Sequence, residues 1–129
     1  FSKFSFDKNY NIIGDFDLFI RMSLREKIFS IQEPLAFYRI HDSNMTTKKI
    51  ELNITELERW FKKNYKNKNF RKYNFSNVKK MIQSLKIKQH CISGNVINVF
   101  FELFKSPINF LNLKYIFFLV LPKHIIEKF

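Results

Sequence analysis

Glycine and cysteine are scarce in this sequence of 129 residues, and their scarcity excludes several kinds of site. With only two glycines, the chain has no glycine-rich loop of the kind that cradles the phosphates of a nucleotide. The single cysteine, Cys91, excludes an internal disulfide and a cysteine-based zinc site, and it fits a reducing compartment. It falls within a stretch of helical apolar spacing, which predicts an inert, partly buried thiol.

Long apolar runs and a leader peptide are also missing. The apolar run Tyr115–Leu121 is seven residues long, whereas a membrane-spanning helix needs about 20. We therefore expect this run to lie in a core or against a membrane surface. The opening residues, FSKFSFDKNY, include neither an initiator Met nor the apolar core of a signal peptide. We expect the sequence to begin inside a longer protein.

Acidic residues are absent from one long stretch of the chain. Residues 1–44 carry six basic and six acidic residues, whereas residues 45–129 carry 17 basic and five acidic ones and account for the net charge of +12. Between Arg59 and Lys88 there are 11 basic residues and no acidic one. The basic part is open to three interpretations: a solvated helical surface, attachment to an anionic membrane, or a groove that stacks nucleic-acid bases on its interleaved aromatic residues.

Apolar spacing predicts a mixed beginning and a helical remainder. A helix is expected over 15–26, with Asp15 as its N-cap, followed by short strands at 28–31 and 35–41. From Thr46 onward the pattern is helical, and Ile50, Ile54, Leu57 and Phe61 form an apolar stripe with Trp60 beside it. A polar linker is expected over 64–69. Further helices are expected over 75–91, 95–105 and 108–121.

Two segments carry residues that are able to perform chemistry: GDFDLFIRMS at 14–23 and PLAFYRIHDSNMT at 34–46. Each has a structural interpretation. Carboxylates at a helix start complement the helix dipole, and Arg21 follows Asp17 at the spacing of a surface ion pair. His41, between a strand and a loop, is often only a hydrogen-bonded residue in such a place, although a neutral imidazole also suits a metal.

Taken together, the two segments resemble the end of the catalytic domain in family 2 glycosyltransferases of the Rossmann-like, type A fold. In that family an acidic pair opens a helix, and a Pro-Leu-x-x-Tyr-Arg-x-His strand and an Asn-Met-Ser/Thr turn follow. The order and spacing agree here over roughly residues 1–50. The matching residues are Asp15, Asp17, Leu18, Arg21, Pro34, Leu35, Tyr38, Arg39, His41, Asn44, Met45 and Thr46.

The resemblance implies a role for each matching residue. Asp15 occupies the position of the catalytic base, which takes the proton from the acceptor hydroxyl during attack on the anomeric carbon. Asp17 and Arg21 would support the helix, and His41 matches a position that in some relatives helps to bind the divalent metal or the diphosphate. Gly14 stands where the family usually has Glu, so one contact of the family pattern is missing.

The resemblance also implies an architecture: an α/β fragment in which one helix and two short strands form the edge of the transferase domain over residues 1–46. A basic, mainly helical extension would follow over 47–129. Nothing in the sequence matches the nucleotide-binding half or the metal-binding Asp-x-Asp of the family. We therefore expect these to lie upstream of Phe1, and we expect the isolated chain to bind no cofactor tightly and to transfer no sugar.

The whole enzyme would, by this resemblance, use a nucleotide-sugar donor, Mg²⁺ or Mn²⁺, and a glycan or lipid-linked acceptor in surface polysaccharide synthesis. A cytoplasmic location is expected, with peripheral contact to the inner face of the membrane. The alternative is a non-enzymatic basic helical module that binds an anionic membrane or nucleic acid, of which nucleic acid is the less favoured partner.

Overall fold

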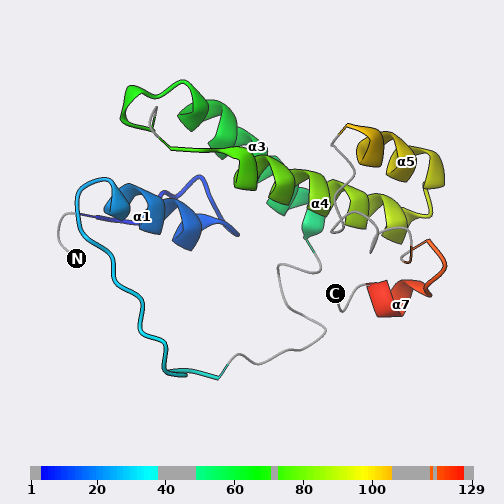
Figure 1. Cartoon of the computed structure of the whole chain (residues 1–129), viewed down its shortest axis with the longest axis horizontal. Coiled ribbons are helices and arrows are strands. Elements are labelled where there is room, and N and C mark those ends of the chain that lie inside the picture. The colour runs from blue at the N-terminus through cyan, green and yellow to red at the C-terminus, as the bar shows by residue number, and fades with distance from the viewer. Residues whose placement is uncertain (1–3, 38–48, 71–72, 106–116, 118, 127–129) are drawn as a thin grey trace. The chain divides into compact units, whose positions relative to one another are not determined.

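The chain divides into two compact units, residues 1–73 and 74–129. The computed structural model describes residues 4–37, 49–70, 73–105, 117 and 119–126. Within these ranges the regular structure is helical and no strand occurs (Figure 1). None of the described helices is both long and apolar enough to cross a bilayer.

The first unit contains helix α1 (Gly14–Ser23), helix α3 (Ile50–Tyr65) and the 3₁₀ turn η1 (Lys68–Phe70). Its core is centred on Leu57 and Trp60 of α3, which are 0% and 2% exposed. The Trp60 ring makes edge contacts with Phe16 of α1 and with Phe70 of η1, at centroid distances of 4.9 and 6.1 Å. The indole therefore joins α1 to α3 and η1, which lie more than 25 residues further along the chain.

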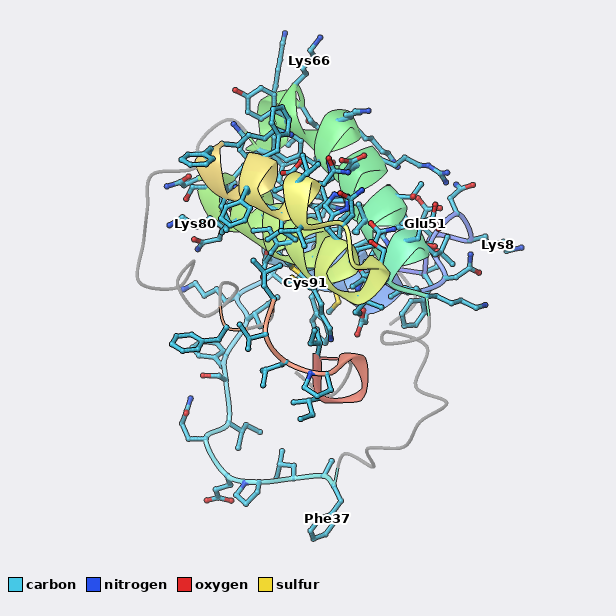
Figure 2. All side chains as sticks on the ribbon, turned by 90° about the vertical axis from the view of Figure 1, so that its right-hand side faces the viewer. Lys8, Phe37, Glu51, Lys66, Lys80 and Cys91 are labelled. Carbon is cyan, nitrogen blue, oxygen red and sulfur yellow. The ribbon has the colours of Figure 1, made fainter. Side chains whose placement is uncertain are left out.

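The expected α/β fragment is wrong for the residues that the structure describes. Residues 28–37 form no strand, and the apolar side chains along them are exposed, with Phe37 projecting away from the chain (Figure 2). A strand exists only when its backbone pairs with another strand, and the described residues offer none. The β propensity of this segment is therefore not sufficient to form a strand, because no partner strand is described. The remainder of the second expected strand, residues 38–41, lies outside the described ranges.

The expected N-cap at Asp15 is also wrong. Helix α1 begins at Gly14, one residue earlier, and its N-cap residue, Ile13, makes no side-chain cap. The carboxylate of Glu56, from α3, instead accepts hydrogen bonds from the backbone amides that lead into the helix. The turn that leads into α1 is thus held by a residue distant in the sequence, and of the amides at this helix end Glu56 binds that of the N-cap residue, Ile13.

The second unit contains helices α4 (Ser76–Ser93), α5 (Val96–Phe104) and α7 (Lys123–Ile126). Both α5 and α7 contact α4. Their core consists of Ile87, Cys91, Val99 and Ile126. Burial raises the pKa of the Cys91 thiol, so little thiolate forms at neutral pH, as suits a packing residue. The helix expected over 108–121 lies mostly outside the described residues.

The turn between α4 and α5 depends on a left-handed glycine. Gly94 has φ = +73°, its N–H donates to the carbonyl of Cys91, and the next N–H, of Asn95, donates to the carbonyl of His90. The Asn95 side chain then accepts a hydrogen bond from the Asn98 amide and caps α5. This arrangement ends one helix and starts the next within two residues.

Gly94→Ala is expected to lower the free energy of unfolding of the second unit by about 1 kcal/mol, because alanine is strained at positive φ. Steric crowding plays no part, since nothing lies within 4 Å of the added methyl. Gly14→Ala is the matched control: it stands in a helix, where alanine is favoured, and should be neutral or slightly stabilising. Thermal unfolding followed by circular dichroism measures both. Equal melting temperatures for the two variants would contradict the conformational argument.

The unit boundary after Tyr73 differs from the sequence-based boundary at 46/47. Helix α3 lies in the same compact unit as α1, through Trp60 and Glu56, rather than with the helices that follow it. The structure thus groups the chain by packing. The division at 46/47, into a transferase-domain edge and a basic extension, came from the family resemblance and stays a prediction.

Candidate functional site

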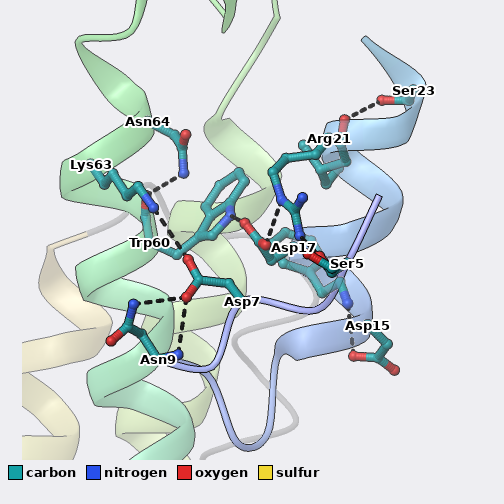
Figure 3. A network of polar contacts seen from close by, with 12 residues as sticks. Ser5, Asp7, Asn9, Asp15, Asp17, Arg21, Ser23, Trp60, Lys63 and Asn64 are labelled. Atoms are coloured by element: carbon teal, nitrogen blue, oxygen red, sulfur yellow. Dashed lines mark hydrogen bonds and ion pairs between the residues drawn. The ribbon is translucent and has the colours of Figure 1, made fainter. Parts of the chain in front are cut away.

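Asp17 connects helices α1 and α3. Its carboxylate is 2% exposed, and its two oxygens accept hydrogen bonds from Trp60 Nε1 at 3.0 Å and from Arg21 Nε at 2.8 Å (Figure 3). The pairing of Asp17 with Arg21 at i,i+4 is present, but it is not the surface pair that the spacing alone predicts, because the carboxylate is buried. Asp17 is thus engaged in holding α1 against α3.

Arg21 extends the same network to the start of the chain. Its Nε donates to Asp17, and its Nη2 donates to the backbone carbonyl of Ser5 at 2.7 Å. The guanidinium fork therefore joins α1 to the segment that precedes it. About a third of the side chain, 34%, stays exposed. Arg21 supports the local structure and still presents part of its charge to solvent.

Asp15 has different surroundings from Asp17. The two positions differ by two residues, which is about 200° around a helix, so the side chains point to nearly opposite sides. Asp15 is exposed, and the one hydrogen bond recorded for it runs from the neighbouring Phe16 amide to Oδ1, at 2.7 Å. Figure 3 shows its carboxylate directed away from Trp60. Asp15 is therefore the carboxylate of α1 that a ligand in solution can reach.

Glu56 is a buried carboxylate that sequence analysis did not select. It is 1% exposed and accepts hydrogen bonds from the amides of Asn11, Ile12 and Ile13 at 2.8, 2.9 and 3.2 Å. Burial by itself raises the pKa of Glu56, but the three amides outweigh it and the pKa is lowered. Its partners lie 43 to 45 residues away, so no local spacing could have indicated this role.

An open cavity of about 570 Å³ lies in the first unit, on the side of α1 that carries Asp17. Its basic wall is formed by Arg21, Arg25 and Lys63. Further polar groups come from the side chains of three asparagines and one acid, and the apolar part of the lining comes from Phe4, Leu24 and Phe70. The polar lining residues are Asp17, Asn64, Asn67 and Asn69. Asp15 does not line this cavity.

The metal site expected at His41 cannot be placed, because His41 lies outside the described residues. Within the described ranges, no group of three or more His, Cys, Asp or Glu residues is arranged to hold a metal ion. The structure therefore brings together Asp17 and Arg21, sets Asp15 apart on the other side of α1, and leaves His41 as a prediction.

Comparison of the chain with protein-family models, with curated proteins and with solved structures finds no match. The resemblance to family 2 glycosyltransferases therefore rests on the motif residues themselves. Of these, Asp15, Asp17 and Arg21 are described, whereas the segment from Tyr38 to Thr46 is not.

Proposed function

We propose that this chain is the acceptor-side part of a glycosyltransferase that moves a sugar from a nucleotide-sugar to a glycan or lipid-linked acceptor, with Asp15 as the general base. The observation that supports this proposal is the contrast between the two acids of α1. Asp17 is buried and engaged by Trp60 and Arg21, whereas Asp15 is exposed at the start of the same helix. One carboxylate holds the helix in place and the other is available to a substrate.

The chemistry required of Asp15 is a single proton transfer. Its carboxylate would accept the proton of the acceptor hydroxyl while that oxygen attacks the anomeric carbon, which inverts the configuration there. A position in the first turn of α1 suits this role, because a carboxylate there interacts favourably with the helix dipole. Asp17 and Arg21 would keep α1, and hence Asp15, in position.

The donor side of the reaction would be supplied elsewhere. By the resemblance, the nucleotide and its Mg²⁺ or Mn²⁺ would be bound by a part of the protein encoded upstream of Phe1. Of the 129 residues, His41 would help to bind the metal or the diphosphate. Such an enzyme would act in the cytoplasm, at the inner face of the membrane, where lipid-linked acceptors are found. Surface polysaccharide synthesis is the process that this placement supports.

The test begins with the coding DNA upstream of Phe1 and continues with an assay of the whole product. The proposal expects alternating strands and helices with an Asp-x-Asp after a strand, and turnover of a nucleotide-sugar by the full-length protein. The 129 residues alone should release no nucleoside diphosphate above the uncatalysed rate. Turnover by the isolated chain would contradict this division of the site. Absence of transferase sequence upstream, or of turnover by the full-length protein, would overturn the proposal itself.

A second candidate function, attachment to an anionic membrane, is favoured by the outer face of α5. Ile97, Phe101 and Phe104 follow one another at helical spacing and are 82%, 62% and 80% exposed. Bulky apolar side chains are rarely left together in water unless they serve an interaction. The lysines of the basic part of the chain would add attraction to anionic lipid. This function is compatible with sugar transfer to a lipid-linked acceptor.

Membrane attachment predicts that the chain floats with vesicles of phosphatidylglycerol and phosphatidylcholine and is released by salt. The double variant Ile97→Ser/Phe101→Ser should weaken the partition by about tenfold or more, since each large side chain withdrawn from the interface removes a favourable transfer free energy. Phe19→Ser, which changes an exposed aromatic residue of α1, is the control and should have little effect. Membrane attachment through α5 would be contradicted if the chain bound an oligonucleotide in preference to vesicles. It would also be contradicted if the double variant and Phe19→Ser weakened vesicle binding equally.

A further inference from the structure

The cavity of the first unit has an excess of positive charge that the proposed transfer chemistry does not use. Arg21, Arg25 and Lys63 line it, against one acidic residue, Asp17. That carboxylate is already occupied, because its two oxygens accept hydrogen bonds from Trp60 and from Arg21. Since Asp17 and Arg21 form an ion pair, the unbalanced charges among the lining residues are those of Arg25 and Lys63, and Lys63 itself lies near Asp7.

Both remaining cations are exposed to solvent, although Lys63 also contacts Asp7 and lies 6.0 Å from the centroid of the Tyr10 ring. Arg25 is exposed, at the end of the turn that follows α1. Lys63 Nζ lies 3.4 Å from Asp7 Oδ2, a long contact, and the lysine side chain is 61% exposed. An exposed ion pair of this kind contributes little to stability, typically about 0–1 kcal/mol, so an incoming anion displaces it easily. The cavity is thus lined by two exposed cations and by the partly exposed guanidinium of Arg21, which already donates to Asp17 and to the Ser5 carbonyl.

The remaining lining suits a small polar molecule that carries an anionic group. Asn64, Asn67 and Asn69 also line the cavity; Asn64 Nδ2 already donates to the Trp60 carbonyl and Asn67 Oδ1 already accepts from the Asn69 amide, and the remaining amide groups are able to donate or accept. Phe70, which is 4% exposed, belongs to the apolar part of the lining and is held in place by Trp60. A volume of about 570 Å³ lies in the range of cavities that take small ligands, about 300–1,000 Å³.

We propose that this cavity binds the phosphate group of a small phosphorylated ligand, with Arg25 and Lys63 as the main phosphate contacts and Arg21 as the fixed one. Guanidinium and ammonium groups are the side chains best suited to phosphate oxygens. The cavity lies on the opposite side of α1 from Asp15, so it is a second site. The inference does not depend on the sugar-transfer proposal, and it holds whether or not Asp15 is a base.

The test is isothermal titration of the full chain with inorganic pyrophosphate, glucose 1-phosphate and a soluble short-chain phosphatidic acid, at low and at physiological salt. Arg25→Ala and Lys63→Ala should each weaken binding by about tenfold or more, because each removes a charge-assisted contact. Their matched controls are Arg59→Ala and Lys62→Ala, which remove the same charges from exposed positions outside the cavity. These controls should change the affinity by less than about twofold at physiological salt.

Each outcome decides a point. Weaker binding in the two cavity variants alone supports the site. The probe that binds best then identifies the source of the phosphate group: a free phosphate ester if it is glucose 1-phosphate, and a lipid headgroup if it is phosphatidic acid. Equal loss in cavity and control variants would mean general attraction to a basic chain and would overturn the proposal, as would the absence of binding by all three probes. All four positions are exposed, so melting temperatures close to that of the unmodified chain are expected and confirm that the variants are folded.

Discussion

Asp15→Asn in the full-length enzyme is expected to lower the rate of sugar transfer by about 10²- to 10⁴-fold, the usual contribution of a general base. Asparagine keeps the size and polarity of the side chain but cannot take up the acceptor proton. The change should fall on kcat, while the KM for the nucleotide-sugar stays the same, because Asp15 would touch the acceptor and not the donor. Initial rates over a range of donor concentrations measure both quantities.

Two controls make the Asp15 result specific. Glu26→Gln neutralises another exposed carboxylate just after α1 and should leave the rate nearly unchanged. Unfolding of Asp15→Asn should occur close to the unmodified temperature, because the hydrogen bond recorded for Asp15 runs to its own neighbour, Phe16. Asp17→Asn, in contrast, alters the contact with Arg21 and should lower the melting temperature. Full activity of Asp15→Asn would remove the central support of the transferase proposal.

Helices α4 and α5 of the second unit were predicted closely because the signals that define them are local, whereas α7 was expected to be only a short tail. The expected ranges 75–91 and 95–105 compare with Ser76–Ser93 and Val96–Phe104 in the structure. Apolar spacing marks the helix faces, and the Ser93-Gly94 stop needs no information from elsewhere in the chain. Where the determining contacts lie within a few residues, the sequence alone was sufficient.

The packing of the first unit was predicted less well, because it depends on contacts distant in sequence. Spacing assigned Phe61 to the apolar stripe of α3 and set Trp60 beside it, yet Trp60 is 2% exposed and Phe61 is only half-buried. The difference lies in the buried acceptor that Asp17 offers to the indole N–H, which allows the whole ring to be enclosed. That acceptor lies 43 residues away, and no spacing rule refers to it.

The candidate sites divide in the same way. The helix that carries Asp15, Asp17 and Arg21 was predicted, as was the i,i+4 pair. The cavity was not, since α1, the end of α3 and η1 contribute to it together with the segment around Phe4. The strands at 28–31 and 35–41 were expected from the local residue pattern and from the family resemblance. Propensity without a partner strand does not make a sheet, and the described part of this segment is exposed.

The first unit should lose stability in acid through Glu56. The pKa of Glu56 is lowered in the folded state. The ionised carboxylate therefore stabilises the fold when the pH is above the pKa of an unfolded glutamate, about 4.3. This stabilisation is lost as the pH falls through the lowered pKa of the folded state. Glu56→Gln removes the negative charge of the side chain that accepts hydrogen bonds from the backbone amides of Asn11, Ile12 and Ile13. It should reduce the free energy of unfolding at pH 7 and flatten its dependence on pH below about 4.3.

Removal of the acceptor altogether should have the largest effect on stability. Glu56→Ala leaves three amides without the carboxylate that binds them and is expected to cost about 2–4 kcal/mol at pH 7. Urea unfolding is followed by the fluorescence of Trp60, which is the single tryptophan and lies one turn along α3 from Glu56. This signal reports directly on the first unit. Glu51→Gln, an exposed change in the same helix, is the control. Asp7, whose pKa is also lowered, is present in every variant, so the difference in acid stability between the variants is due to Glu56.

The acid transition of Glu56→Gln decides the electrostatic argument. If it is identical to that of the unmodified chain, the amides leading into α1 do not depend on this carboxylate.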